Sequence, residues 1–287
     1  MNKSPLTSIL STGKANSPDA YRRNLRELIQ KICLLGLWRG AFFEHAAFYG
    51  GTALRMLYGF ERFSEDLDFS LLKEAPDFSL ASYLDFVRRE LAAWGIIAQT
   101  ELIQKKDSNL KSAFVKAKTL QTLINFEIPA SDLRSLHRDE LSSVKFEIDP
   151  HPPCAFASES RYILEPIPFS VRVMSLQDLF AGKMHAVLAR GWLSRVKGRD
   201  WYDLIWFIRS GASLNLPHLE ARLKQSGHFP SDQMLSEDRF RQILKDRIFQ
   251  IDFRQAAEDV MPFIEDTRAL ESWSDEFFIH LVEKIQI

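Results

Sequence analysis

Residues 50–69 read GGTALRMLYGFERFSEDLDF and combine a double glycine, an apolar segment, a polar loop and two nearby carboxylates. The run AAFYG before them predicts a strand, and TALRMLYG predicts a short helix capped by Thr52. After the loop, LDFSLL predicts a second strand. Its alternation directs Leu67 and Phe69 to a core and leaves Asp66 and Asp68 together at the loop-to-strand junction.

This pattern favours phosphate and metal chemistry. Residues i and i+2 of a strand share a face about 7 Å apart, so Asp66 and Asp68 could share divalent cations of the kind used in nucleotidyl transfer. An Asp-x-Asp pair is also a common form of solvated surface charge. The hydrophobic residues around the pair favour the metal hypothesis.

The glycines and the loop could hold phosphates. Gly50 and Gly51 would let backbone amides at a helix N-terminus approach a phosphate closely. Arg62 could clamp the phosphate and Ser64 could donate a hydroxyl. A tight turn, an exposed arginine and a serine that caps the loop are the structural alternatives.

Outward from this stretch, the chain divides near residue 170. After a polar leader (1–19), Ser17 and Pro18 predict the start of a long helix with Leu25, Leu28, Ile29, Ile32 and Cys33 on one face. Strands are predicted in 96–103, 112–120, 122–128 and 144–149, whereas the segments from Ser175 onward have helical patterns. The expected fold class is α+β, with a mixed-sheet core (20–168) and a helical domain (169–287).

Composition narrows the class of protein. The 287 residues contain 46% hydrophobic residues, and 37 basic residues balance 38 acidic ones. The chain is therefore expected to fold around a real core without bulk attraction to nucleic acid or membrane. Two cysteines cannot form a disulfide framework, and no signal peptide or membrane span is evident. The expected location is the cytoplasm.

The quoted stretch resembles the AbiEii/AbiGii-type toxin family, a branch of the nucleotidyltransferase superfamily with a fold like the DNA polymerase β catalytic core. Two glycines, Arg62, Ser64, Asp66 and Asp68 follow the family's order, although Phe63 stands where the superfamily more often has glycine. The resemblance implies that Asp66 and Asp68 are catalytic metal ligands for Mg²⁺, with Mn²⁺ as an alternative. It also implies nucleotide binding by Gly50, Gly51, Thr52, Arg62 and Ser64.

A second block, SLQDLFAGKMHAVLARGWLSRVKGRDWYDLIWF, is similar to the family's downstream motif. Lys183 would neutralise the triphosphate, and Asp200 and Asp203, three apart on one helix face, would orient it or assist proton transfer. The helical domain is thus expected to contribute to the active site. Ion pairs on a solvated helix are the alternative. Trp201 and Trp206 could stack on bases, but their helical spacing favours core packing.

The superfamily commonly has a third carboxylate on a later strand. In VKFEIDP, Glu147 and Asp149 alternate onto one face, and Glu147 is the first choice because it lies farther inside the strand. The choice between the two stays open.

The implied function is transfer of a nucleoside monophosphate from an NTP to an acceptor hydroxyl. The family resemblance suggests RNA, with tRNA ends as the leading acceptor, and a toxin of a toxin–antitoxin or phage-defence pair with a cognate antitoxin as partner. Two alternatives remain: a nucleotidyltransferase for small molecules such as antibiotics, and a catalytically silent nucleotide-binding regulator.

Overall fold

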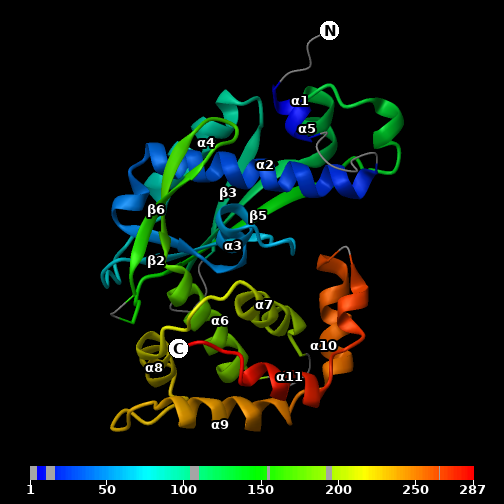
Figure 1. Ribbon diagram of the computed structural model, residues 1–287. Helices are drawn as coiled ribbons and strands as arrows, with labels where there is room; N and C mark the ends of the chain where they lie inside the picture. The colour runs from blue at the N-terminus through cyan, green and yellow to red at the C-terminus, as the bar shows by residue number, and fades with distance from the viewer. Residues whose placement is uncertain (1–4, 11–16, 104–109, 154–155, 192–195, 265) are drawn as a thin grey trace. The chain divides into compact units, whose positions relative to one another are not determined.

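The computed structural model describes residues 5–10, 17–103, 110–153, 156–191, 196–264 and 266–287 (Figure 1). The chain divides into two compact units. Unit 1 comprises Met1–Gly59, Phe63–Pro152 and Ser160–Val173, and unit 2 comprises Phe60–Arg62, Pro153–Glu159 and Met174–Ile287. The last boundary between the two units along the chain lies between residues 173 and 174, a few residues beyond the division expected from the sequence. Two short earlier segments also belong to unit 2.

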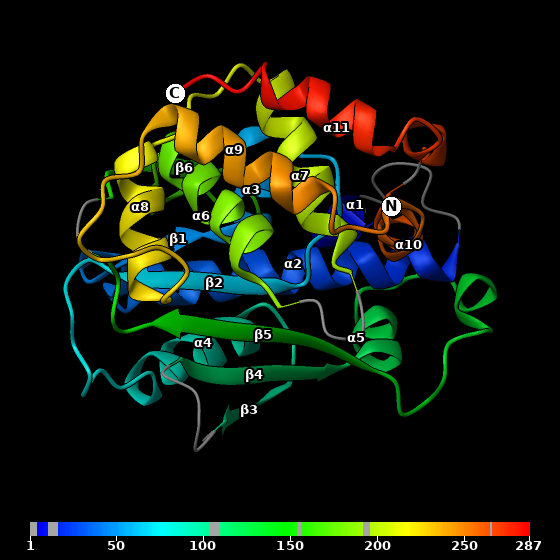
Figure 2. The same ribbon diagram turned by 90° about the horizontal axis from the view of Figure 1, so that it is seen from below.

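A mixed sheet forms the framework of unit 1. In the described part of the chain seven strands follow the order β3-β4-β5-β2-β1-β7-β6, which confirms the predicted α+β class (Figure 2). β1 is antiparallel to β2, whereas β2 and β5 are parallel. The strand bounds are β1 Ala46–Tyr49, β2 Asp66–Leu71, β3 Ala98–Ile103, β4 Lys111–Lys118, β5 Leu141–Asp149, β6 Ser158–Ile163 and β7 Phe169–Met174.

Helix α2 (Pro18–Arg39) supplies much of the core of unit 1. Its predicted start is confirmed, because the Ser17 side chain accepts a hydrogen bond from the Ala20 amide. The predicted apolar face is also confirmed: Leu25, Leu28, Ile29, Ile32 and Cys33 are all buried. The other helices of this unit are α1 (Pro5–Leu10), α3 (Gly50–Tyr58), α4 (Ala81–Ala93), α5 (Thr119–Asn125) and the 3₁₀ turns η1 (Phe42–Glu44) and η2 (Ala130–Leu133).

One segment of unit 1 has a different structure from the predicted one. The strand expected over 122–128 is wrong, since most of this segment lies in helix α5 and the turn after it. Thr119, Thr122 and Leu123 are buried at helical spacing. A short apolar run does not by itself distinguish a strand from a helix, and here the tertiary environment selects the helix.

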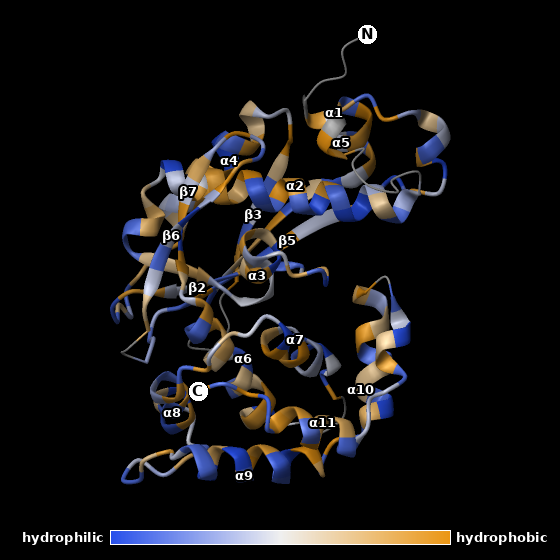
Figure 3. Cartoon of the chain, viewed as in Figure 1, coloured by the Kyte–Doolittle hydropathy of each residue, from blue (hydrophilic) through white to orange (hydrophobic). Residues whose placement is uncertain are grey.

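Unit 2 is built mainly from helices, as predicted. They are α6 (Leu176–Ala189), α7 (Gly198–Arg209), α8 (Leu216–Gln225), α9 (Glu237–Ile248), α10 (Phe253–Val260), η3 (Met261–Phe263), η4 (Thr267–Leu270) and α11 (Asp275–Val282). Helix α9 is typical: hydrophilic residues alternate with hydrophobic ones along it in Figure 3, and Phe240, Leu244 and Ile248 are buried at i, i+4 and i+8.

The core of unit 2 is aromatic. Trp201 is fully buried, and its ring contacts Phe253 and Phe278 edge-on, each at 5.1 Å between centroids. The core-packing hypothesis is therefore confirmed for Trp201. Among the described residues, none of the helices is both long and apolar enough to cross a membrane.

Candidate active site

The turn between β1 and α3 is built around Asp68. Helix α3 begins at Gly50, directly after β1 ends at Tyr49, and Gly50 has a φ of 83°. Besides requiring this left-handed conformation, the position has no room for a side chain, because a Cβ there would collide with the Asp68 carboxylate. Gly50 therefore lets the helix N-terminus approach this carboxylate closely.

Strand β2 presents its carboxylates as the alternation predicts. Leu67 and Phe69 are fully buried, whereas Asp66 and Asp68 are half-buried on the other face. Asp68 lies opposite Tyr49 on β1, which places it beside the glycine turn. The two aspartates thus remain partly accessible on a strand that is otherwise in the core.

Thr52 has a different local role from the one predicted. The prediction that it caps the helix is wrong, because the helix starts two residues earlier and its N-cap is Tyr49. The fully buried Thr52 instead donates its hydroxyl to the carbonyl oxygen of Asp66. This hydrogen bond ties the first turn of α3 to the start of β2.

Strand register favours Glu147 over Asp149 as a third carboxylate. In the parallel pair β2–β5, Asp68 lies opposite Glu147, while Ser70 lies opposite Asp149. Neighbouring strands are about 4.8 Å apart, so Glu147 is the carboxylate directly across from Asp68. Asp149 accepts a hydrogen bond from the His151 amide at 2.9 Å and so orders the turn after β5.

Sequence reasoning missed Lys145 in this cluster. It lies opposite Asp66 and forms an ion pair with Glu147. Burial lowers the pKa of Lys145, but Glu147, Asp66 and Asp68 outweigh burial and raise the pKa overall. The i, i+2 spacing of Lys145 and Glu147 in VKFEID could have shown that the two side chains share a face.

The donor set suits Mg²⁺. Magnesium prefers oxygen ligands and is usually held by one or two carboxylates, with phosphates and water completing the shell. Among the described residues, no group of three or more His, Cys, Asp or Glu side chains is arranged to hold a metal ion. Asp66 and Asp68 next to the tight glycine turn fit a site that shares its metal with substrate phosphates, with Glu147 across from them.

The loop between α3 and β2 separates two predicted phosphate ligands. Ser64 belongs to unit 1, where its carbonyl oxygen accepts a hydrogen bond from the Gln30 side chain at 3.1 Å. Arg62 belongs to unit 2 and is 3% exposed. Gly50, Gly51, Thr52, Ser64, Asp66, Asp68 and Glu147 thus all belong to unit 1, where contacts and register join Gly50, Asp68 and Glu147. Arg62, Lys183, Asp200 and Asp203 belong to unit 2, where ion pairs join them.

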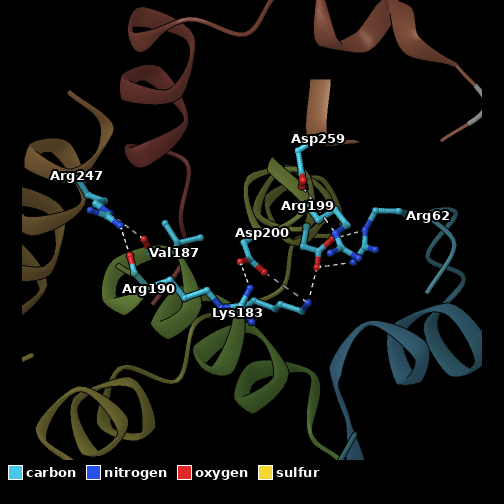
Figure 4. A network of polar contacts seen from close by, with 9 residues as sticks. Arg62, Lys183, Val187, Arg190, Arg199, Asp200, Arg247 and Asp259 are labelled. Atoms are coloured by element: carbon cyan, nitrogen blue, oxygen red, sulfur yellow. Dashed lines mark hydrogen bonds and ion pairs between the residues drawn. The ribbon is translucent and has the colours of Figure 1, made fainter. Parts of the chain in front are cut away.

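Asp203 is the centre of the unit 2 network, whose members Arg62, Lys183, Arg190 and Asp200 are labelled in Figure 4. Its two carboxylate oxygens accept hydrogen bonds from Arg62 at 2.9 and 3.0 Å. The Lys183 ammonium lies 2.6 Å from Asp203 Oδ2 and 4.0 Å from Asp200 Oδ1. Arg190 in turn pairs with Asp200 at 2.5 Å. Two buried carboxylates are therefore enclosed by three cationic side chains.

These contacts decide the charge of Asp203. Burial raises its pKa, but the Arg62 and Lys183 charges and hydrogen bonds outweigh burial and hold the pKa below its ordinary value. Arg62 responds in the opposite sense: burial lowers its pKa, and Asp203 raises it overall. The carboxylate therefore stays ionised and orients Lys183, whose side chain is 18% exposed.

The comparisons with known proteins agree with these features. The family model described as "Nucleotidyl transferase AbiEii toxin, Type IV TA system" matches residues 32–277. The chain matches no curated protein. It is similar in fold to the crystal structure of JHP933 from Helicobacter pylori, at a TM-score of 0.53 and 18% identity over 91% of this chain and 90% of that one.

A second H. pylori structure, of a protein described as a candidate nucleotidyltransferase, has a TM-score of 0.48 and 19% identity over 90% of this chain and 89% of its own. The family match covers most of the sequence, including both the Asp66/Asp68 strand and the Lys183 helix. This chain therefore belongs to the AbiEii nucleotidyl transferase toxin family of type IV toxin–antitoxin systems.

Proposed function

We propose that this enzyme is a Mg²⁺-dependent toxin that transfers a nucleoside monophosphate from an NTP to a hydroxyl of RNA, with a tRNA end as the leading acceptor. Mn²⁺ is the alternative metal. The observation that carries the proposal is the placement of Asp68 between the glycine turn and Glu147. Carboxylates beside a helix N-terminus can serve a metal and a phosphate at the same place.

In the proposed reaction the acceptor oxygen forms a bond to the α-phosphorus of the NTP. The bond from this phosphorus to the bridging oxygen breaks, pyrophosphate leaves, and the hydroxyl proton passes to solvent. Asp66 and Asp68 would hold the metal, with Glu147 across from them as the proposed third carboxylate, and the metal would neutralise charge on the attacking and leaving oxygens. Gly50 and Gly51 would present backbone amides and Ser64 a hydroxyl to the phosphates.

Lys183 is proposed to neutralise the triphosphate. Its pairing with Asp203 supports the orienting role for that aspartate over proton transfer, because a carboxylate with a lowered pKa and two cationic partners is a weak base. Arg62 is proposed to hold Asp203 rather than to contact phosphate directly, since it is buried in the same ion pair. The type IV family further suggests a cognate antitoxin, and a role in phage defence, as its biological setting.

The test uses α-phosphate-labelled NTPs with total RNA, in Mg²⁺ or in EDTA. We expect label to appear in RNA only with Mg²⁺ and to be absent with an Asp66→Asn/Asp68→Asn double variant. Glu101→Gln on β3 is the matched control, because Glu101 is an exposed strand carboxylate paired with Lys116. Label in an added aminoglycoside but not in RNA would contradict the RNA acceptor, and equal transfer in EDTA would contradict the metal site.

A further inference from the structure

A serine of unit 2 lies between two histidines that the proposed reaction does not use. The Ser226 hydroxyl oxygen is 2.9 Å from His185 Nε2 and 3.0 Å from His228 Nδ1. The two imidazole rings are nearly perpendicular, at 87°, with 6.4 Å between their centroids. His185 is two positions from Lys183 on α6, so the two side chains leave the helix on nearly opposite faces. This histidine–serine cluster is therefore separate from the Asp203 network.

Arg222 adds a positive charge to the cluster. It precedes Ser226 by one helical turn on α8, which packs against α6, and its side chain is half-buried. Within the described ranges, no carboxylate lies within ion-pairing distance of Arg222. Glu220 on the same helix is instead paired with Lys224 at 2.7 Å. The cluster thus contains a guanidinium whose charge no described carboxylate neutralises by direct contact.

His218 extends the same face of α8 into the interior. It precedes Arg222 by one turn and is fully buried, and neither of its ring nitrogens has a hydrogen-bond partner among the described residues. At least one of these nitrogens carries a hydrogen. Buried polar atoms almost always have a partner, and an ordered water or a bound ion supplies it where the protein does not. A buried donor near Arg222 therefore favours a ligand that accepts hydrogen bonds.

Positive charge dominates around His185. Burial is the largest influence on its pKa, which falls to about 4, and the further influences are four cationic or titratable side chains: Arg222, His228, Arg190 and His218. The carboxylate that acts on His218 is Asp178, which is buried and already accepts hydrogen bonds from the Ser175 hydroxyl, the Ala157 amide and the Asn215 side chain. The surroundings of the cluster therefore favour a bound anion and disfavour a metal cation.

We propose that Arg222, His185, Ser226 and His228 bind a phosphate group. A guanidinium, a hydroxyl and two imidazoles can each donate hydrogen bonds, and a phosphate has enough oxygens to accept several at once. A carboxylate has only two oxygens and uses such a donor set less completely. The inference rests on the proposed function only for the source of the phosphate, which is either the acceptor RNA or a free phosphate.

Calorimetric titration of the full chain in EDTA tests the site, because EDTA removes metal-bridged phosphate binding from the measurement. The probes are inorganic phosphate, acetate and a short oligouridylate. We expect saturable binding of phosphate that is tighter than binding of acetate. Lys183→Met and the Asp66→Asn/Asp68→Asn variant should bind phosphate as the wild type does, so the result is independent of whether the proposed transfer reaction occurs.

Two variants locate the phosphate. Arg222→Gln removes the charged donor and should weaken phosphate binding by about tenfold. His228→Gln changes an exposed side chain and should also weaken binding, even if Arg222→Gln fails to fold. Arg239→Gln is the matched control, because it removes the same charge from an exposed position on α9 and should have no effect.

A spectroscopic measurement distinguishes binding in the cluster from binding elsewhere. A bound anion favours the protonated imidazole, so saturating phosphate should raise the pKa of His185 from about 4 toward its ordinary value of 6.5. Proton NMR at a series of pH values measures this change, with His185→Gln identifying the signal. The shift should be lost in Arg222→Gln and kept in Arg239→Gln.

The probes also distinguish the two sources. Tighter binding of oligouridylate than of inorganic phosphate, with the same loss in Arg222→Gln, would assign the cluster to RNA, whereas equal or weaker binding would assign it to free phosphate. Both results support a phosphate site. Failure of both probes to bind, tighter binding of acetate, or binding unaffected by Arg222→Gln and His228→Gln would overturn the proposal. Metal-dependent transfer could still be observed in that case, so the two hypotheses fail separately.

Discussion

The carboxylates in the two clusters of ionisable groups differ in burial and in how closely cationic side chains contact them. In unit 1, Asp66 and Asp68 are half-buried, and Lys145 lies in electrostatic range of both and of Glu147. In unit 2, Asp203 is fully buried and has two cationic partners in direct contact. A partly accessible carboxylate pair can still bind a ligand cation, whereas a carboxylate neutralised within the core stabilises and orients its neighbours. The comparison therefore predicts that mutation of the unit 1 carboxylates lowers activity, whereas mutation of Asp203 lowers stability.

The largest effect is expected for Asp68→Asn, measured as nucleotidyl transfer. Loss of a metal-binding charge should lower the rate by about 10³-fold, or about 4 kcal/mol in transition-state stabilisation. The melting temperature should stay constant or rise, because removal of one charge relieves repulsion with the neighbouring carboxylates. Glu101→Gln should change neither quantity. Wild-type turnover in Asp68→Asn would remove this residue from the metal site.

Asp203→Asn should be the most destabilising of these variants. It leaves the buried Arg62 without a full counter-charge, and breaking a buried pair typically costs about 3–5 kcal/mol of unfolding free energy. Asp85→Asn, which breaks an exposed pair with Arg88, is the control and should cost no more than about 0.5 kcal/mol. Urea unfolding measures both. Similar losses in the two variants would contradict the structural role of Asp203.

Lys183→Met should affect catalysis more than folding. The methionine keeps the apolar stem but removes the ammonium, and we expect a loss of about 2–4 kcal/mol in transition-state stabilisation. Folding should suffer less than in Asp203→Asn, since Asp203 keeps its two hydrogen bonds to Arg62. Transfer rates and thermal melting provide the comparison. Full activity of Lys183→Met would show that Lys183 serves only in its structural ion pair with Asp203.

Acid should destabilise unit 2 through its histidines. Burial is the main cause that lowers the pKa of His185 and of His218 to about 4, below their ordinary value of 6.5. The unfolded chain therefore takes up protons first, and stability should fall as the pH drops from about 6.5 to about 4, by up to about 3 kcal/mol for each histidine.

Hydrogen exchange at a series of pH values can measure this loss of stability separately for unit 1 and unit 2. His218→Gln should flatten the pH dependence, whereas His45→Gln, at an exposed position, should leave it unchanged. Stability that stays constant between pH 6.5 and 4 would contradict the prediction.

The smallest effect is expected for two glycine variants, whose comparison distinguishes the cost of backbone strain from a change at the candidate active site. Gly50→Ala and Gly59→Ala both place alanine at a positive φ, 83° and 75°, and this backbone strain alone should cost each variant about 1–2 kcal/mol in stability. Only Gly50→Ala also forces a Cβ against Asp68, because Gly59 has open space around its Cβ position. We therefore expect transfer activity to fall in Gly50→Ala alone, measured under conditions where both variants are folded. Equal activities would contradict the role of Gly50 in placing Asp68.

Much of the framework could be predicted from local patterns. The N-cap of α2, its apolar face and the alternation of Leu67 and Phe69 with the aspartates are all found as expected. Helix capping and strand alternation depend on residues within a few positions of one another, so the sequence contains the needed information. The 122–128 segment shows the limit, since its short apolar run fits a helix as well as a strand.

The amino-acid sequence by itself determined which residue types could perform the chemistry and on which face of an element each would lie. Only the tertiary structure decided which of them meet. Strand pairing placed Glu147, and not Asp149, opposite Asp68 and added Lys145 to the cluster. Chain packing assigned Arg62 and Ser64, two positions apart, to different units. The physical reason is that register and ion pairing between distant segments depend on the surfaces of both partners, which local periodicity does not describe.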